Sequence, residues 1–271
     1  MKRILCPVDF SETAYKAAGT AAKLAQKCEA QLNLLNVQSN FETTPAELMW
    51  GKKRKVEAVA NQLEELSSEI SLAYKISCYG NVQSSDLPLS KIISVVGSDY
   101  DLVVMGTNGS DQVYDFLFGT NSYRVAKESS VPVLLLPPDY EFEDFSNIVF
   151  AADYFHEVTT PPEQLIKWAG LLSARITFLQ IMTTEYRHQQ EQKLIHIQLS
   201  MKQFLADLYH DFKTIYADQP IEGIMDYIKE NDCDVLALNF RHHSMIEKLF
   251  HKNVLKNLCA ITPCPLFLFH L

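Results

Sequence analysis

The segment Leu102-Val103-Val104-Met105-Gly106-Thr107-Asn108-Gly109, separated by nine residues from Gly119-Thr120-Asn121-Ser122, decides the fold of this chain. Its apolar run predicts a buried strand, and residues 120–129 predict a helix. Glycines let peptide N–H groups approach an anion closely, and the first turn of a helix leaves N–H donors unpaired. The segment therefore predicts a site for a phosphate or a nucleotide.

The composition is that of an ordinary globular protein, with 271 residues, 47% hydrophobic and 21% charged. A net charge of −9 disfavours binding to nucleic acid or to anionic membranes. No segment reaches the roughly 20 apolar residues of a membrane span, and the start of the chain is too polar for a signal peptide. The six cysteines form no C-x-x-C pair. We expect reduced thiols and a cytoplasmic protein.

The sequence contains two related halves. Three landmarks recur in the same order: Ile4–Phe10 and Ile148–Tyr154, Asp101–Met105 and Asp234–Leu238, Val131–Leu136 and Cys264–Phe269. This order predicts a duplicated domain, with one copy at 1–138, an acidic linker at 139–146 that directly follows Pro137 and Pro138, and a second copy at 147–271.

Short apolar strands alternate with helices in both halves. Strands are expected near 3–8, 31–37, 72–79, 101–106 and 132–136, with helices near 12–28, 44–70, 86–97 and 120–129. The second half has expected strands near 147–152, 175–181, 211–217, 233–239 and 264–269. This alternation predicts an α/β fold of two Rossmann-like, doubly wound domains, each a parallel sheet with helices on both faces.

In a doubly wound sheet, ligands bind at the carboxyl ends of the strands where the strand order reverses. If the first and fourth strands are neighbours there, Asp9 lies beside Gly106 and offers a carboxylate to a ribose or a base. Asp9 has an alternative role in capping the next helix together with Ser11. Residues 106–122 would take the phosphates, and the main chain of Asn36–Gln38 would bind an adenine edge.

The spacing Gly106-x2-Gly109-x9-Gly119-Thr120 is neither a P-loop nor a dinucleotide fingerprint. It resembles the ATP-binding pattern of the universal stress protein family. Pro7–Ser11 matches the end of that family's first strand, and Val131–Val133 with Pro137 matches its last strand. The resemblance implies two five-stranded sheets of order 3-2-1-4-5. It also implies ATP in the first domain, with a divalent ion such as Mg²⁺ on its phosphates.

The candidate nucleotide-binding residues all lie at expected strand ends, in the glycine loop or at the following helix start. They are Pro7, Val8, Asp9, Val37, Gly106, Thr107, Gly109, Gly119, Thr120, Asn121 and Ser122. The second half has Asn239 and His242 where Gly106 and Gly109 stand. Side chains there would fill the phosphate space, so we expect the second domain to be degenerate and not to bind ATP.

The favoured function is an ATP-binding stress-response or regulatory protein with an unknown protein partner. One alternative is a slow ATPase or an autophosphorylating or adenylating enzyme, although no general base accompanies the glycine loop. Another is a scaffold with a structural nucleotide. A third places a metal or another ligand in the second domain, where all eight histidines lie. The apolar last strands predict an internal pseudo-dimer of the two halves, and a homodimer of the whole chain stays open.

Overall fold

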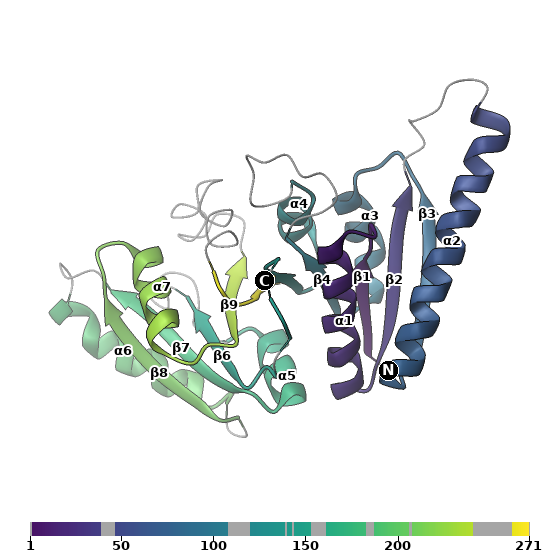
Figure 1. Cartoon of the computed structure of the whole chain (residues 1–271). Helices are drawn as coiled ribbons and strands as arrows, with labels where there is room; N and C mark the ends of the chain where they lie inside the picture. Colours follow the sequence, from purple (N-terminus) through teal and green to yellow (C-terminus); the bar gives the residue numbers. More distant parts are fainter. Residues whose placement is uncertain are drawn as a thin grey trace. The chain divides into compact units, whose positions relative to one another are not determined.

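The chain divides into two compact units, Met1–Asp139 and Tyr140–Leu271 (Figure 1). The computed structural model describes residues 2–38, 47–107, 120–138, 140–142, 144–152, 161–182, 187–205, 208–240 and 262–270. Packing of the two halves as a pseudo-dimer stays a prediction.

The first unit is a parallel sheet with flanking helices. Its elements are β1 (Lys2–Pro7), α1 (Glu12–Lys27), β2 (Ala30–Gln38), α2 (Glu47–Tyr74), β3 (Cys78–Ser84), α3 (Leu89–Val96), a 3₁₀ turn (Gly97–Asp99), β4 (Leu102–Gly106), α4 (Thr120–Glu128) and β5 (Val133–Leu136). The strand order is β3-β2-β1-β4-β5, and every pair is parallel. The order therefore reverses between β1 and β4, which is where a doubly wound sheet binds its ligands.

The helices of the first unit pack on the sheet through narrow apolar faces. Helix α1 lies against β1, β2 and β4, and its contact face is built largely from buried alanines, which allow a close approach. Helix α2 contacts α1 and runs along β2 and β3, while α3 contacts α4 (Figure 1). The predicted α/β class is confirmed.

The third strand of the first unit was predicted wrongly. The expected strand at 72–79 is instead the last turn of α2, which runs to Tyr74, and β3 begins only at Cys78. Lys75, the first residue after the helix, has a φ of 55°, which the helix cannot continue through. Leu72 misled the prediction because it is apolar, yet it lies on the solvent face of α2 and is 80% exposed.

The second unit repeats this arrangement. Its elements are β6 (Asn147–Ala151), α5 (Glu163–Leu172), β7 (Arg175–Met182), α6 (Arg187–Lys202), β8 (His210–Tyr216), α7 (Pro220–Glu230), β9 (Val235–Phe240) and β10 (Leu266–His270). The order β8-β7-β6-β9-β10 is again parallel throughout and again reads 3-2-1-4-5 within the unit. Its core is rich in aromatic rings: Trp168 meets Phe267 edge-on at 6.0 Å.

The second compact unit begins at Tyr140, within the stretch 139–146 that is expected to be a linker. Phe145 is 1% exposed, and its ring packs on Tyr140 and edge-on against Phe142, with centroids 6.4 and 5.1 Å apart. The acidic composition concealed this aromatic cluster.

The same carboxylate contact joins the first and fourth strands in each unit. In the first unit the main-chain N–H of Arg3 donates to Asp101 Oδ2 at 3.0 Å, and the N–H of Asp101 donates back to Arg3 O at 2.8 Å. In the second, the N–H of Asn147 donates to Asp234 Oδ2 at 2.7 Å, and the N–H of Asp234 donates to Asn147 O at 3.0 Å. Both contacts lie at the amino-terminal ends of the strands.

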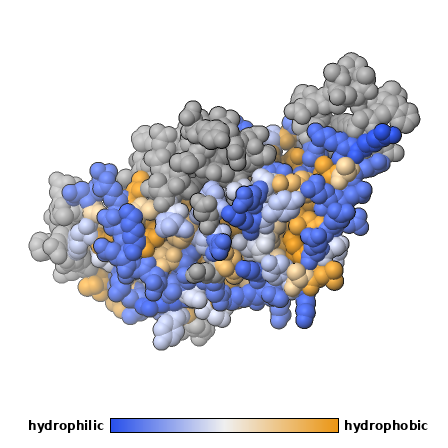
Figure 2. All heavy atoms as spheres, in the orientation of Figure 1, coloured by the Kyte–Doolittle hydropathy of each residue, from blue (hydrophilic) through white to orange (hydrophobic). Residues whose placement is uncertain are grey.

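Hydrophilic residues cover much of the described surface on the face in Figure 2, and apolar residues form smaller patches between them. Among the described helices, none combines the length and the apolar character needed to cross a bilayer.

Candidate functional site

The carboxyl ends of β1 and β4 lie next to each other in the first unit. Ile4 pairs with Leu102 and Leu5 with Val103, so both strands end at one edge of the sheet. Asp9 follows β1 there, and Gly106 is the last residue of β4. The predicted proximity of these two strand ends is confirmed.

Asp9 organises the turn from β1 into α1. Its Oδ1 accepts hydrogen bonds from the main-chain N–H of Ser11 at 3.0 Å and from the Ser11 hydroxyl at 2.6 Å. Ser11 is the N-cap of α1, and its Oγ accepts the N–H of Ala14 at 3.2 Å. Asp9 therefore supports the capping residue rather than capping the helix itself, and it is exposed at the sheet edge.

The start of α4 is fastened to the end of β4 by Ser122. The Ser122 hydroxyl donates to Gly106 O at 2.9 Å and also approaches Thr107 O at 3.3 Å. Ser122 is 3% exposed. Because its hydroxyl proton is directed at the main chain, Ser122 positions the helix start, whereas the sequence suggested a phosphate donor.

Gly106 lies where an added side chain would be tightly packed. A Cβ at this position would lie 3.2 Å from both Thr13 Cβ and Thr13 O at the start of α1. Thr107 is 1% exposed, and its N–H donates to Leu136 O at 3.0 Å. Close packing of α1 against β4 thus accounts for the glycine that ends this strand.

The end of β2 presents main-chain groups toward β1. Leu35 O accepts the N–H of Val8, while Gln38 O accepts the N–H of Ser85 on the β3 side. Neighbouring residues of a parallel strand direct their main-chain groups to opposite sides, so Val37 is directed toward β1, like Leu35. β1 ends at Pro7, so Val37 faces the sheet edge beyond it.

The side chain of Asn36 takes the place of a ladder hydrogen bond at this edge. Its Nδ2 donates to Val8 O at 2.7 Å, and Asn36 is 4% exposed. A regular parallel ladder would direct the Val37 N–H to Val8 O. No main-chain hydrogen bond joins these two residues among those described. Sequence reasoning missed this role of Asn36, although a polar residue within the apolar run of β2 is a signal for it.

At the corresponding edge of the second unit, two buried amide side chains replace different residues of the first unit. Gln180 of β7 stands where Asn36 stands in β2, because Ile148 pairs with Ile176 as Ile4 pairs with Leu32. Its Nε2 donates to Ile181 O at 2.7 Å, the acceptor equivalent to Val37 O.

Asn239 of β9 stands at the place of Gly106. It is 1% exposed, and neither polar atom of its side chain has a hydrogen-bond partner within the described part of the chain. A glycine position has thus been filled by an amide.

Several candidate residues fall partly or wholly outside the described residues. Gly109 and Gly119 are outside them, and for Thr120 only its place as the first residue of α4 is described. Asn121 is exposed at the same helix start, while Pro7 and Val8 are buried beneath the edge.

Within the described residues, neither a metal-ligand cluster nor a reactive thiol marks this edge. Across the described ranges no three His, Cys, Asp or Glu side chains are grouped to hold a metal ion. Cys6 is 0% exposed, and burial raises the pKa of its thiol far above the ordinary value. Cys6 is therefore an inert core residue.

Each unit thus has the topology of a doubly wound, Rossmann-like α/β fold. The model of the universal stress protein family matches residues 1–137. The chain belongs to the universal stress protein family.

One curated relative and two solved structures illustrate what the chain is similar to. A protein of Thermus aquaticus, the universal stress protein in QAH/OAS sulfhydrylase 3'region, is 30% identical over 139 residues, which are 50% of this chain and 98% of the relative. A universal stress protein from Archaeoglobus fulgidus has a similar fold, with a TM-score of 0.74, 14% identity and coverage of 99% of this chain and 98% of its own. Another, solved in complex with cAMP, covers 50% of this chain and 96% of its own at 18% identity and a TM-score of 0.38.

Proposed function

We propose that the first unit binds ATP at the carboxyl edge of β1, β2 and β4, and that the chain works as an adenine-nucleotide-dependent stress-response protein. The observation that carries the proposal is the 2.9 Å hydrogen bond from Ser122 to Gly106 O. It holds the N-terminus of α4 at the edge that Asp9 also reaches. Unpaired N–H groups and the helix dipole favour a phosphate at that point.

Each candidate residue has a defined part in this proposal. The main chain of Val37 binds the adenine edge, and Asp9 accepts from the ribose. Pro7 and Val8 form the floor below them. The phosphates are held by main-chain and hydroxyl groups of Gly109, Gly119, Thr120 and Asn121, and Gly106 and Thr107 support them from the end of β4. Mg²⁺ would screen the charge of the phosphates.

The described contacts support main-chain groups that are available to an adenine base in the first unit only. Asn36 satisfies Val8 O with its side chain, which leaves the Val37 N–H for a ligand. In the second unit the Gln180 amide already occupies Ile181 O, and Asn239 replaces a glycine. We therefore propose one ATP site per chain.

Calorimetric titration of the full chain with magnesium–ATP tests the proposal. We expect one site per chain, abolished in Gly109→Val and retained in His242→Val, which alters the corresponding position of the second half. Two equivalent sites, or unchanged affinity in Gly109→Val, would overturn it. Titration with ADP and with cAMP ranks the affinities of the adenine nucleotides. Titration with ATP in the presence of EDTA measures how much Mg²⁺ contributes to the affinity. ADP formed from ATP during the titration, and absent with Gly109→Val, would instead indicate an ATPase.

A further inference from the structure

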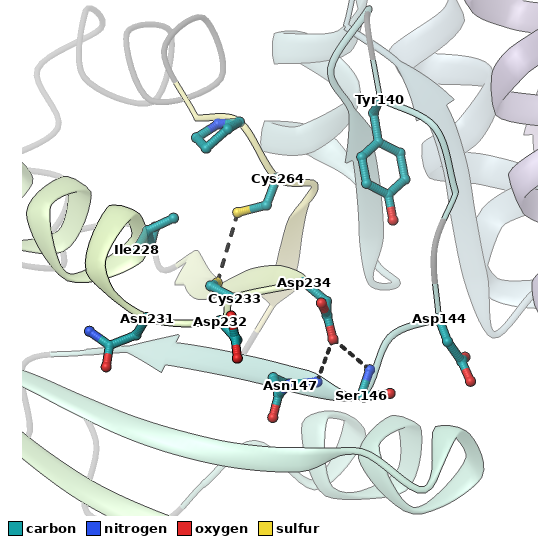
Figure 3. A pocket seen from close by; sticks show the side chains of 11 residues that line it. Tyr140, Asp144, Ser146, Asn147, Ile228, Asn231, Asp232, Cys233, Asp234 and Cys264 are labelled. Carbon is teal, nitrogen blue, oxygen red and sulfur yellow. Dashed lines mark hydrogen bonds between the residues drawn. The ribbon is translucent and has the colours of Figure 1, made fainter.

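The second unit has a pocket at the opposite end of its strands from the sheet edge described above. The pocket has a volume of ≈ 650 Å³ and is lined from the residues that precede β6, β9 and β10. Both Cys233 and Cys264 line it, together with the carboxylates of Asp144, Asp232 and Asp234 (Figure 3).

Two free thiols face each other at this pocket. The sulfur atoms of Cys233 and Cys264 are 3.9 Å apart, although the residues are 31 positions apart in the chain. Cys264 is buried and Cys233 is partly exposed. Figure 3 shows the Cys264 sulfur directed toward Cys233.

The sheet holds this pair together. β9 and β10 are parallel neighbours, with Leu236 opposite Leu266, and the N–H of Leu236 donates to Pro265 O at 3.0 Å. Each cysteine lies two residues before its strand, so the strand pairing fixes both Cα positions. A disulfide has an S–S distance of about 2.05 Å, so side-chain rotation has to close a gap of about 2 Å.

The two sulfurs are chemically distinct. The hydrogen bond from Cys233 lowers the pKa of the Cys264 thiol against the opposing effect of burial, and the N–H of Leu236 lowers it further. The same hydrogen bond, with burial, raises the pKa of Cys233. Cys264 is therefore the more acidic thiol of the pair, and the thiolate is the nucleophile in cysteine oxidation.

We propose that Cys233 and Cys264 form a redox-active dithiol that a small, neutral hydroperoxide oxidises to a disulfide. The Cys264 thiolate attacks the peroxide and breaks the O–O bond. This gives a sulfenic acid and an alkoxide, which takes up the proton lost by Cys264 and leaves as an alcohol or, from hydrogen peroxide, as water. Cys233 then attacks the Cys264 sulfur and breaks the S–O bond. Its proton leaves with the hydroxide as water, so two thiols and one peroxide give one disulfide, one alcohol and one water.

The charge around the pocket selects the class of oxidant. Asp144, Asp232 and Asp234 all line it, and the whole chain carries a net charge of −9. Carboxylates repel glutathione disulfide, which is anionic at neutral pH, whereas an uncharged hydroperoxide is not repelled. A volume of ≈ 650 Å³ admits a small peroxide easily.

Titration of the reduced full chain with substoichiometric hydrogen peroxide tests the proposal. The reaction is quenched with N-ethylmaleimide and followed by intact mass and peptide mapping. We expect a first product that carries two fewer N-ethylmaleimide adducts than the reduced chain and that yields a linked Cys233–Cys264 peptide. A first product that contains Cys259 or any first-unit cysteine, or faster reaction with glutathione disulfide than with peroxide, would overturn it.

Single variants assign the two roles. In Cys233→Ser we expect sulfenic acid on Cys264, trapped by dimedone, because no second thiol can displace the oxygen. In Cys264→Ser the rapid phase should vanish. Cys78→Ser, which removes a thiol of the first unit, is the matched control and should leave the rate unchanged. Rapid oxidation in Cys264→Ser, or no adduct in Cys233→Ser, would contradict the assignment. Circular dichroism checks that each variant is folded.

Discussion

Asn36 and Gln180 occupy equivalent positions in the two units, but their amides donate to different main-chain oxygens. Asn36 Nδ2 lies 2.7 Å from Val8 O on the neighbouring strand, whereas Gln180 Nε2 lies 2.7 Å from Ile181 O on its own strand. The extra methylene of glutamine permits the second geometry. One amide thus joins two strands at the sheet edge, and the other covers an acceptor there.

Replacing Asn36 should affect both folding and nucleotide binding. Asn36→Leu leaves Val8 O without the amide, and we expect the free energy of unfolding to fall by about 1–3 kcal/mol. The Val37 N–H would then turn to Val8 O, so ATP binding should weaken as well. Urea denaturation and calorimetry measure the two effects. Asn81→Ala, on the exposed face of β3, should change stability by less than about 0.5 kcal/mol. Equal behaviour of the two variants would contradict this account.

Ser122 and Ser129 provide a matched pair at the two ends of α4. Ser122 Oγ donates to Gly106 O, while Ser129 Oγ donates to Val131 O at 2.7 Å. Each alanine variant should destabilise the protein by roughly 1 kcal/mol, because each removes a buried hydrogen bond. Only Ser122→Ala should also weaken ATP binding, by about tenfold, which corresponds to about 1.4 kcal/mol. Calorimetry should distinguish them, and a similar loss of affinity in Ser129→Ala would show that the effect is general destabilisation.

Two glycine variants should shift stability in opposite directions. In Gly106→Ala the new Cβ meets Thr13 Cβ and Thr13 O at 3.2 Å, so the start of α1 has to move, at a cost of about 1–3 kcal/mol. Gly19 lies within α1 with nothing within 4 Å of an added Cβ. Gly19→Ala should therefore stabilise the protein by about 0.5–1 kcal/mol through helix propensity. Thermal melts report the sign, and a stabilising Gly106→Ala would refute the packing argument.

Asp211 should contribute a pH-dependent part of the stability of the second unit. Desolvation by burial raises the pKa of Asp211. The hydrogen bond from Lys213 and the positive charge of nearby Arg175 outweigh that effect and hold the pKa of Asp211 below its usual value. A carboxyl pKa that is lower in the folded state stabilises the fold above the unfolded pKa of about 3.9 and loses that contribution as the pH falls through the folded value.

Asp211→Asn should accordingly lower the free energy of unfolding at pH 7 by at most about 1 kcal/mol, since the pair is partly exposed. At pH 3, below the unfolded pKa of about 3.9, the difference from the parent protein should be smaller. Chemical denaturation at both pH values measures it. Asp226→Asn, which changes an exposed carboxylate on α7, serves as the control. A stability difference that grows toward acid pH would contradict the predicted sign of the Asp211 contribution.

The architecture was largely predictable from the sequence because it depends on periodic apolar patterns. The runs around Ile4 and Leu102 are continuous, as expected for strands buried on both faces. The pattern failed at residues 72–79, where exposed Leu72 is apolar by type but not by position. Periodicity cannot distinguish a strand from a helix end that carries an apolar residue on its solvent face.

The finer geometry of the candidate site was not predictable in the same way. Asn36 contacts Val8, and Ser122 contacts Gly106, across 28 and 16 residues of chain. Such contacts depend on strand register and side-chain length, which no local pattern encodes. The glycine spacing pointed to a phosphate site, but it did not show that Gly106 also makes room for Thr13.

The reciprocal contacts of Asp101 with Arg3 and of Asp234 with Asn147 have an evolutionary consequence. They secure each sheet at one end of its strands, while the equivalent positions Gly106 and Asn239 lie at the other end. If the two halves descend from one duplicated domain, a substitution at the carboxyl rim can change the ligand while the contact at the opposite rim still holds the first and fourth strands together.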